Sequence, residues 1–242
     1  EIAKAYGIDS NVYRVRVLGE FPRSDDDSVI PLDLIESAMV REVQGYGDTV
    51  WGVDVARFGD DRTTLAKRRR NTLLDKVKVW KNKDTMQVAG LVKAEWEITP
   101  KHLKPVAIMV DVIGLGAGVV DRLKEEGLPV KAVNVSESAP IKERYARLRD
   151  ELWFRGREWF EAKDCHMAKD EELASELSSI KYEILPTGKI KVESKEDRKK
   201  RGLRSCDLAD AFINTFAPGA LVPASFNKPI NYPQHHVSRG VV

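Results

Sequence analysis

The chain has 242 residues, enough for one well-cored domain with extensions or for two small domains. Hydrophobic residues make up 42% of it, and no stretch approaches the roughly 18 uninterrupted apolar residues of a membrane helix, so we expect no membrane partner. Two cysteines exclude a disulfide framework, and a net charge of only +2 says little about nucleic acid. The sequence opens on Glu1 without a signal-peptide pattern, and we expect a piece of a longer chain in a reducing compartment such as cytoplasm.

The first part of the chain is polar and irregular apart from a short helix predicted at 31–42. We interpret residues 1–44 as a linker or the edge of a missing upstream domain. From there on, β-branched and apolar runs predict the strands of a globular domain at 45–222. Short gaps between the first three runs favour an antiparallel meander, and the fourth run is continuously apolar, as in a buried strand. The predicted strands are 49–55, 63–66, 73–80, 106–111 and 130–135.

Amphipathic periodicity predicts helices between and after these strands. Pro186, Thr187 and Gly188 separate two short runs, 180–184 and 189–193, and predict a β-hairpin. The proline-containing residues 223–242 are expected to form a flexible tail. The predicted helices are 84–97, 114–126, 141–161, 169–179 and 206–216.

This order of elements resembles the RNase H-like arrangement. We therefore predict an α/β fold in which a mixed sheet, three antiparallel strands followed by parallel strands, is flanked by helices and carries an added β-hairpin. In an RNase H-like sheet the first and fourth strands are neighbours. Residues at the ends of these two strands are therefore expected to meet.

Four acids stand out by their positions in this scheme. Asp54 lies inside the first apolar strand, and Asp111 ends the fourth strand just before a glycine-rich turn. Asp207 and Asp210 stand three residues apart at the start of the last helix and share one face of it. Buried carboxylates are costly unless something pairs them, and Mg²⁺ or Mn²⁺ pairs several at once. Two such ions about 3.5–4 Å apart can drive phosphodiester hydrolysis.

Each acid alone has an ordinary structural explanation. Asp54 could pair with a nearby base at a strand end, Asp111 could serve the turn, and Asp207 could cap its helix. Their combination in this element order favours a metal site. The glycines Gly114, Gly116 and Gly118 do not match a dinucleotide-binding fingerprint, and the sequence has no phosphate-binding loop of the ATPase type.

Basic residues gather in the hairpin and in the segment that leads into Asp207. A solvated charged face is the plain explanation, but the position next to the predicted metal site favours contact with DNA phosphates. Few aromatic residues interleave, so we expect sequence-tolerant binding of double-stranded DNA. A second basic run spans 67–70. The predicted DNA-contacting residues are Lys189, Lys191, Lys195, Lys199, Lys200, Arg201 and Arg204.

Three ordered segments resemble the nuclease motifs of phage terminase large subunits. The first is WGVDVARFGDDRT at 51–63, and the second is VDVIGLGAGVVDRL at 110–123. The third combines ESKED at 193–197 with RGLRSCDLADA at 201–211. The upstream phrase YRVRVLGEFP, at 13–22, is similar to the junction that follows the packaging ATPase.

The resemblance implies a C-terminal nuclease domain that uses Mg²⁺ or Mn²⁺ to cut concatemeric viral DNA. It places the catalytic, metal-binding acids at Asp54, which would bridge both ions, at Asp111 and at Asp207. Asp210 lies close by and is kept as a fourth ligand because resolvases of the RuvC type use both acids, and Asp61 is a weaker, second-layer candidate. The chain departs from the family at Cys206, where proline is usual.

The implied partners are double-stranded DNA, the packaging ATPase domain upstream in the same polypeptide, the portal protein and the small terminase subunit. The implied location is the host cytoplasm, at the procapsid. Two other functions remain open. One is a non-catalytic module that docks the motor to the portal, for which the tail at 223–242 is suited. The other is a nuclease that resolves Holliday junctions.

Overall fold

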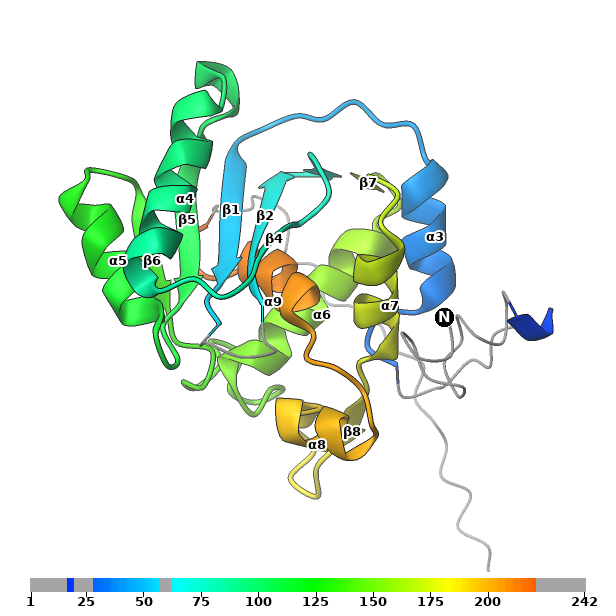
Figure 1. Ribbon diagram of the computed structural model, residues 1–242. Helices are drawn as coiled ribbons and strands as arrows, with labels where there is room; N and C mark the ends of the chain where they lie inside the picture. Colours follow the sequence, from blue (N-terminus) through cyan, green and yellow to red (C-terminus); the bar gives the residue numbers. More distant parts are fainter. Residues whose placement is uncertain (1–16, 20–27, 57–61, 221–242) are drawn as a thin grey trace, which may run out of the picture.

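The computed structural model describes residues 17–19, 28–56 and 62–220. A seven-stranded mixed sheet forms the centre, with helices on both of its faces (Figure 1). The predicted tail and most of the predicted linker lie outside the described residues, as does Asp61. Among the described helices, none combines the length and apolarity that a membrane span requires.

The strands run in the order β6-β5-β1-β2-β3-β7, and β4 pairs with β2 beside β3. β1 pairs antiparallel with β2 and parallel with β5, which in turn is parallel to β6. A separate antiparallel hairpin joins β8 and β9. The strand bounds are β1 Thr49–Asp54, β2 Thr63–Arg69, β3 Thr72–Leu73, β4 Lys78–Trp80, β5 Pro105–Asp111, β6 Val130–Val133, β7 His166–Met167, β8 Tyr182–Ile184 and β9 Ile190–Val192.

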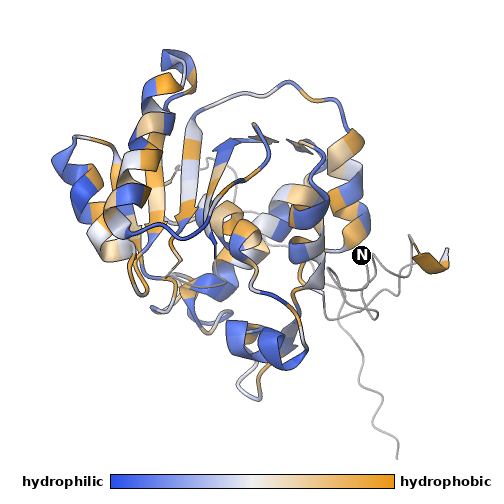
Figure 2. Cartoon of the chain, viewed as in Figure 1, coloured by the Kyte–Doolittle hydropathy of each residue, from blue (hydrophilic) through white to orange (hydrophobic). Residues whose placement is uncertain are grey.

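Two hydrophobic cores lie on opposite faces of the sheet. One forms under α4 and α5, and the larger one lies among α3, α6, α7 and α9 (Figure 1). Figure 2 shows apolar and polar residues mixed along these helices, whereas α8 is polar throughout. The helix bounds are α3 Leu32–Val40, α4 Thr85–Ile98, η2 Lys101–Leu103, α5 Gly116–Glu125, α6 Leu148–Glu161, α7 Glu171–Ser179, α8 Lys195–Lys200 and α9 Asp207–Asn214.

The alternation of side chains along β1 determines which face receives Asp54. Trp51 and Val53 enter the core under α4 and α5, so the alternate residues of the strand, Gly52 and Asp54 among them, face α9. At Gly52 the backbone of α9 comes so close that an added Cβ atom would lie 2.0 Å from the carbonyl oxygen of Ala211. The missing side chain thus lets α9 lie directly on the strand that carries Asp54.

The predicted fold class is confirmed, including the adjacency of the first and fourth predicted strands, β1 and β5. The single strand predicted at 73–80 was wrong in detail. The chain leaves the sheet after Leu73 and returns at Lys78, so two short strands pair with β2.

The long helix predicted at 141–161 begins only at Leu148. Residues before it are held against β9, because Ala146 N–H donates to the Ile190 carbonyl at 3.0 Å and Ile190 N–H donates to the Arg144 carbonyl at 2.7 Å. These bonds give the segment a bridge to the hairpin in place of a helical turn. β7, which has two residues, and α8, which has six, were not predicted.

Candidate active site

Asp54 and Asp111 meet at one edge of the sheet. Both are the last residues of their strands, and the parallel register pairs Val53 with Val110. Because these strands run in the same direction, their carboxyl ends lie side by side. The two acids also face the same side of the sheet, since Val53 and Val110 both enter the core on the other side.

The helix α9 brings two more acids to this edge. Asp207 begins the helix and Asp210 follows one turn later, and both are buried. Together with Asp54 and Asp111 they line a cavity of about 400 Å³. The structure therefore brings all four predicted acids together, although they are spread over more than 150 residues of sequence.

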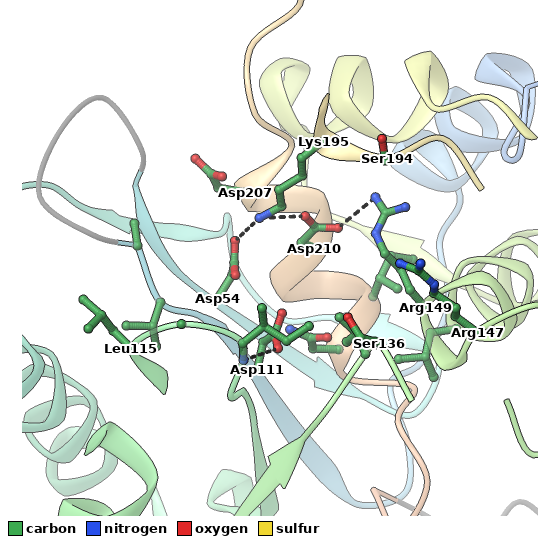
Figure 3. Close-up of a pocket in the computed structure, with 18 of the residues that line it drawn as sticks. Asp54, Asp111, Leu115, Ser136, Arg147, Arg149, Ser194, Lys195, Asp207 and Asp210 are labelled. Atoms are coloured by element: carbon green, nitrogen blue, oxygen red, sulfur yellow. Dashed lines mark hydrogen bonds and ion pairs between the residues drawn. The ribbon is translucent and has the colours of Figure 1, made fainter. Parts of the chain in front are cut away.

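A lysine ammonium lies between two of these carboxylates (Figure 3). Lys195, the first residue of α8, places Nζ 3.3 Å from Asp54 Oδ2 and 3.2 Å from Asp210 Oδ2. Its helix starts here because the Ser194 hydroxyl accepts a hydrogen bond from Asp197 N–H at 3.1 Å. The ammonium marks a point at which two acids can share one cation.

Burial shapes the charge of the acids. It raises the pKa of Asp54 to about 7 against the opposing charge of Lys195, and the negative charge of Asp210 adds to the rise. Burial also raises the pKa of Asp111. At Asp210 burial again opposes ionisation, but Lys195 and Arg149 outweigh it and lower the pKa of that carboxyl. The acids at this edge are therefore poised to gain from additional positive charge.

The two acids of α9 have different surroundings. Asp207 Oδ2 accepts a hydrogen bond from Arg62 N–H at 3.1 Å, and Oδ1 accepts one from the Ser205 hydroxyl. Asp210 instead faces Lys195 and shares it with Asp54 (Figure 3). Asp207 thus joins the start of β2 to α9, whereas Asp210 is oriented toward the cavity acids.

A partly buried ion network supports Asp207. The Arg62 guanidinium pairs with Glu172 and, at 2.7 Å, with Glu176, while its Nε lies 3.5 Å from Asp207. The other oxygen of Glu176 accepts a hydrogen bond from Ala209 N–H at 2.9 Å. Because Cys206 provides no side-chain cap, Glu176 of α7 caps α9 in its place. Burial raises the pKa of Glu176 to about 8.

Arg149 supports Asp210 in the same way. Its guanidinium donates to the Glu193 carbonyl at 2.7 Å and lies 3.6 Å from Asp210. The Cys206 thiol also donates to Asp210, at 3.4 Å. Sequence analysis missed Arg62, Arg149 and Glu176. Glu176 stands three residues after Leu173 and next to Leu177, on the buried face of α7, and this position is the signal that could have indicated it.

The predicted DNA-contacting residues fall into two groups in the structure. In the first group, Lys195 pairs with Asp54 and Asp210. Three more residues pair with acids of the hairpin and α8 region: Lys191 with Glu183, Lys200 with Asp197, and Arg201 with Glu193. Within the ranges that the structure describes, the side chains of Lys189, Lys199 and Arg204 form no ion pair.

The second basic run has a structural role. The Arg68 guanidinium is buried and donates to the Thr215 carbonyl at 2.8 Å and to the Arg70 carbonyl at 2.6 Å. Lys67 pairs with Glu95 at 2.7 Å. These two residues therefore hold α9 and α4 against β2.

The donor set fits a hard divalent cation. Every candidate ligand is a carboxylate oxygen, as Mg²⁺ and Mn²⁺ prefer, and the Lys195 ammonium already stands where two of them would share a cation. Across the described residues, no three acids, histidines or cysteines are grouped as a ready-made metal site. A cation at this point would replace the ammonium.

Comparison with known proteins finds similarity to large terminase subunits. No family model matches the chain. It is 29% identical over 228 residues to the "Probable terminase, large subunit" of Enterobacteria phage P7, an alignment that covers 88% of this chain and 46% of that protein. The chain thus spans about half the length of this relative.

Solved structures share the fold. The nuclease domain of the large terminase subunit gp2 of bacterial virus Sf6 matches with a TM-score of 0.65 and 19% identity, over 78% of this chain and 98% of that one. The large terminase nuclease from thermophilic phage G20c with bound magnesium matches with a TM-score of 0.56 and 12% identity, over 78% and 96%. These findings confirm the resemblance that the sequence motifs indicated.

Proposed function

Because this chain has the fold of large terminase nuclease domains, we propose that it is a metal-dependent endonuclease that cuts double-stranded viral DNA concatemers during genome packaging. The observation that carries the proposal is the shared cation position between Asp54 and Asp210, with Asp111 at the same edge of the sheet. A purely structural module does not require four acids from three elements, three of them buried, to gather in one cavity.

Asp54, Asp111 and Asp210 would hold two Mg²⁺ or Mn²⁺ ions, with Asp54 as the shared ligand. Such ions, when bound, activate the attacking water and stabilise the leaving oxygen of the phosphodiester. Asp207 completes the acid set, but its oxygens are occupied by Arg62 and Ser205, so we assign it mainly to positioning α9. Lys195 keeps Asp54 and Asp210 together before a cation arrives.

The DNA-contacting surface is proposed to be the hairpin together with α8. Lys189, Lys199 and Arg204 are its cations without an ion pair in the described part of the chain. Lys191, Lys200 and Arg201 would exchange their carboxylate partners for phosphates. Such contacts to the backbone carry no base information, so binding would be sequence-tolerant.

The partners and location follow from the same assignment. The nuclease would work behind a packaging ATPase in a longer polypeptide, with the portal protein and small terminase subunit, at the procapsid in the host cytoplasm. The P7 relative is about twice as long as the matched region, which leaves room for such a motor.

The test is cleavage of linear duplex, supercoiled plasmid and four-way junctions by the purified chain in Mn²⁺, Mg²⁺ or EDTA. We expect metal-dependent cutting of duplex and plasmid without preference for junctions. A strong preference for junctions would favour a resolvase. Binding of DNA without cutting under every metal condition would favour a docking role and contradict the proposal.

A further inference from the structure

The cavity has a second wall opposite the acids. Ser136, after β6, and Arg147, just before α6, line the same cavity as Asp54 and Asp111 (Figure 3). Neither residue stands out in the sequence, because serine and arginine in a polar loop are ordinary. The structure alone places them beside the acids.

Hydrogen bonds fix the backbone at Arg147. Its backbone N–H donates to Asp150 Oδ2 at 2.8 Å, and the other oxygen of Asp150 accepts a hydrogen bond from Val192 N–H at 2.8 Å. Asp150 is buried, so one carboxylate fixes both the start of α6 and the end of the hairpin strand β9. Arg147 therefore projects from a rigid site and not from a loose loop.

The Arg147 guanidinium differs from that of Arg149, two residues further on. Arg149 is committed to the Glu193 carbonyl and to Asp210. Arg147 is exposed, and in the described part of the chain no carboxylate pairs with its guanidinium and no hydrogen bond engages it. An exposed cation that lines the same cavity as four carboxylates, and pairs with none of them in the described residues, is available to a ligand.

Arg147 also continues the basic surface of the hairpin. Ala146, the residue before it, donates to the Ile190 carbonyl of β9 at 3.0 Å. Ile190 stands between Lys189 and Lys191, and the charge of Arg147 acts on the nearby Lys191. Cations near one another at the cavity suit a chain of phosphates.

Resting on the proposed function, we propose that Arg147, with the Ser136 hydroxyl, forms a phosphate-binding subsite for the backbone of the DNA strand that enters the cavity. A guanidinium presents paired N–H donors that match two oxygens of one phosphate, and a serine hydroxyl supplies a further donor. Arg149, by contrast, is a positioning residue for Asp210.

The test measures binding of a fluorescent DNA duplex by anisotropy over a series of salt concentrations, in Ca²⁺ buffer. It compares the full chain with Arg147→Ala, Arg147→Lys and the matched control Lys124→Ala, which removes an exposed cation of α5 away from the cavity. We expect Arg147→Ala to weaken binding and to reduce the salt slope by about one. Arg147→Lys should regain part of the affinity, and Lys124→Ala should bind as the wild type does.

Each outcome is informative. A wild-type affinity and salt slope in Arg147→Ala would overturn the subsite while leaving the nuclease proposal standing. Absence of duplex binding by the wild type would overturn both. A lowered melting temperature of Arg147→Ala, with no rescue by lysine, would assign Arg147 to the structure of the α6 start and would also overturn the subsite.

Discussion

At the scale of single residues, the two acids of α9 have different contacts, and the sequence did not predict this difference. Their spacing of three residues puts Asp207 and Asp210 on one face, which alone predicts equal roles. The difference arises from residues far away in the chain, since Arg62 reaches Asp207 and Lys195 reaches Asp210. Such contacts are set by tertiary packing and leave no local pattern.

This division can be measured with Asp207→Asn and Asp210→Asn. We expect Asp210→Asn to weaken Mn²⁺ binding by about a hundredfold or more, and Asp207→Asn by about tenfold. Asp207→Asn should instead cost about 1–3 kcal/mol of unfolding free energy, because Arg62 loses a buried partner. Isothermal titration with Mn²⁺ and urea unfolding supply the two readouts. The reverse order of Mn²⁺ affinities would contradict the assignment.

At the scale of elements, the contact of α9 with β1 determines whether the site can form. We expect Gly52→Ala to lower the unfolding free energy by about 2 kcal/mol and the melting temperature by about 6 °C, because the new methyl group meets the backbone of Ala211. Gly90→Ala is the matched control, since this helical glycine of α4 has open space around it and alanine should stabilise by about 1 kcal/mol.

Calorimetry of the two variants and the wild type measures these melting temperatures. Equal melting temperatures for Gly52→Ala and the wild type would mean that α9 does not lie on β1 as described.

The cap that α7 provides to α9 predicts a dependence of stability on pH. The folded pKa of Glu176, about 8, lies above the ordinary value of 4.5. The folded state therefore holds this proton more tightly, and the stabilisation is fully present below about pH 4.5 and is lost as the pH rises toward 8. In Glu176→Gln this loss should shrink, because glutamine can still accept from Ala209 without a charge.

Urea titrations of the metal-free chain across this pH range provide the measurement. Asp54, whose pKa is also raised, should account for part of the fall that remains. Identical pH profiles for the wild type and Glu176→Gln would show that the Glu176 carboxyl is already charged in the folded state.

Long, strongly patterned elements were predictable, and so was the short hairpin of β8 and β9, because its turn residues mark it. The apolar runs of β1 and β5 and their terminal acids identified both the sheet and half of the site. β7 and α8 were not predicted, because segments of two and six residues carry too little periodicity. The late start of α6 was not predicted, because the bridge between Tyr145 and Ile190 competes with helix formation.

At the scale of the whole molecule, the sheet separates two cores and leaves the acids at its edge. The hairpin and α8 extend beyond this edge and carry most of the predicted DNA-contacting cations (Figure 1). A net charge of +2 conceals this asymmetry, because the basic extension is balanced by acids elsewhere. The distribution of charge over the fold, and not its sum, is what indicates a DNA partner.

The most direct test of the central claim is cleavage of supercoiled plasmid in Mn²⁺ by the wild type, by Asp54→Asn and by Asp121→Asn, an exposed acid of α5 that serves as the control. The account predicts cutting by the wild type and the control, abolished by EDTA and lost in Asp54→Asn while that variant keeps its fold by circular dichroism. Undiminished cutting by folded Asp54→Asn would contradict it.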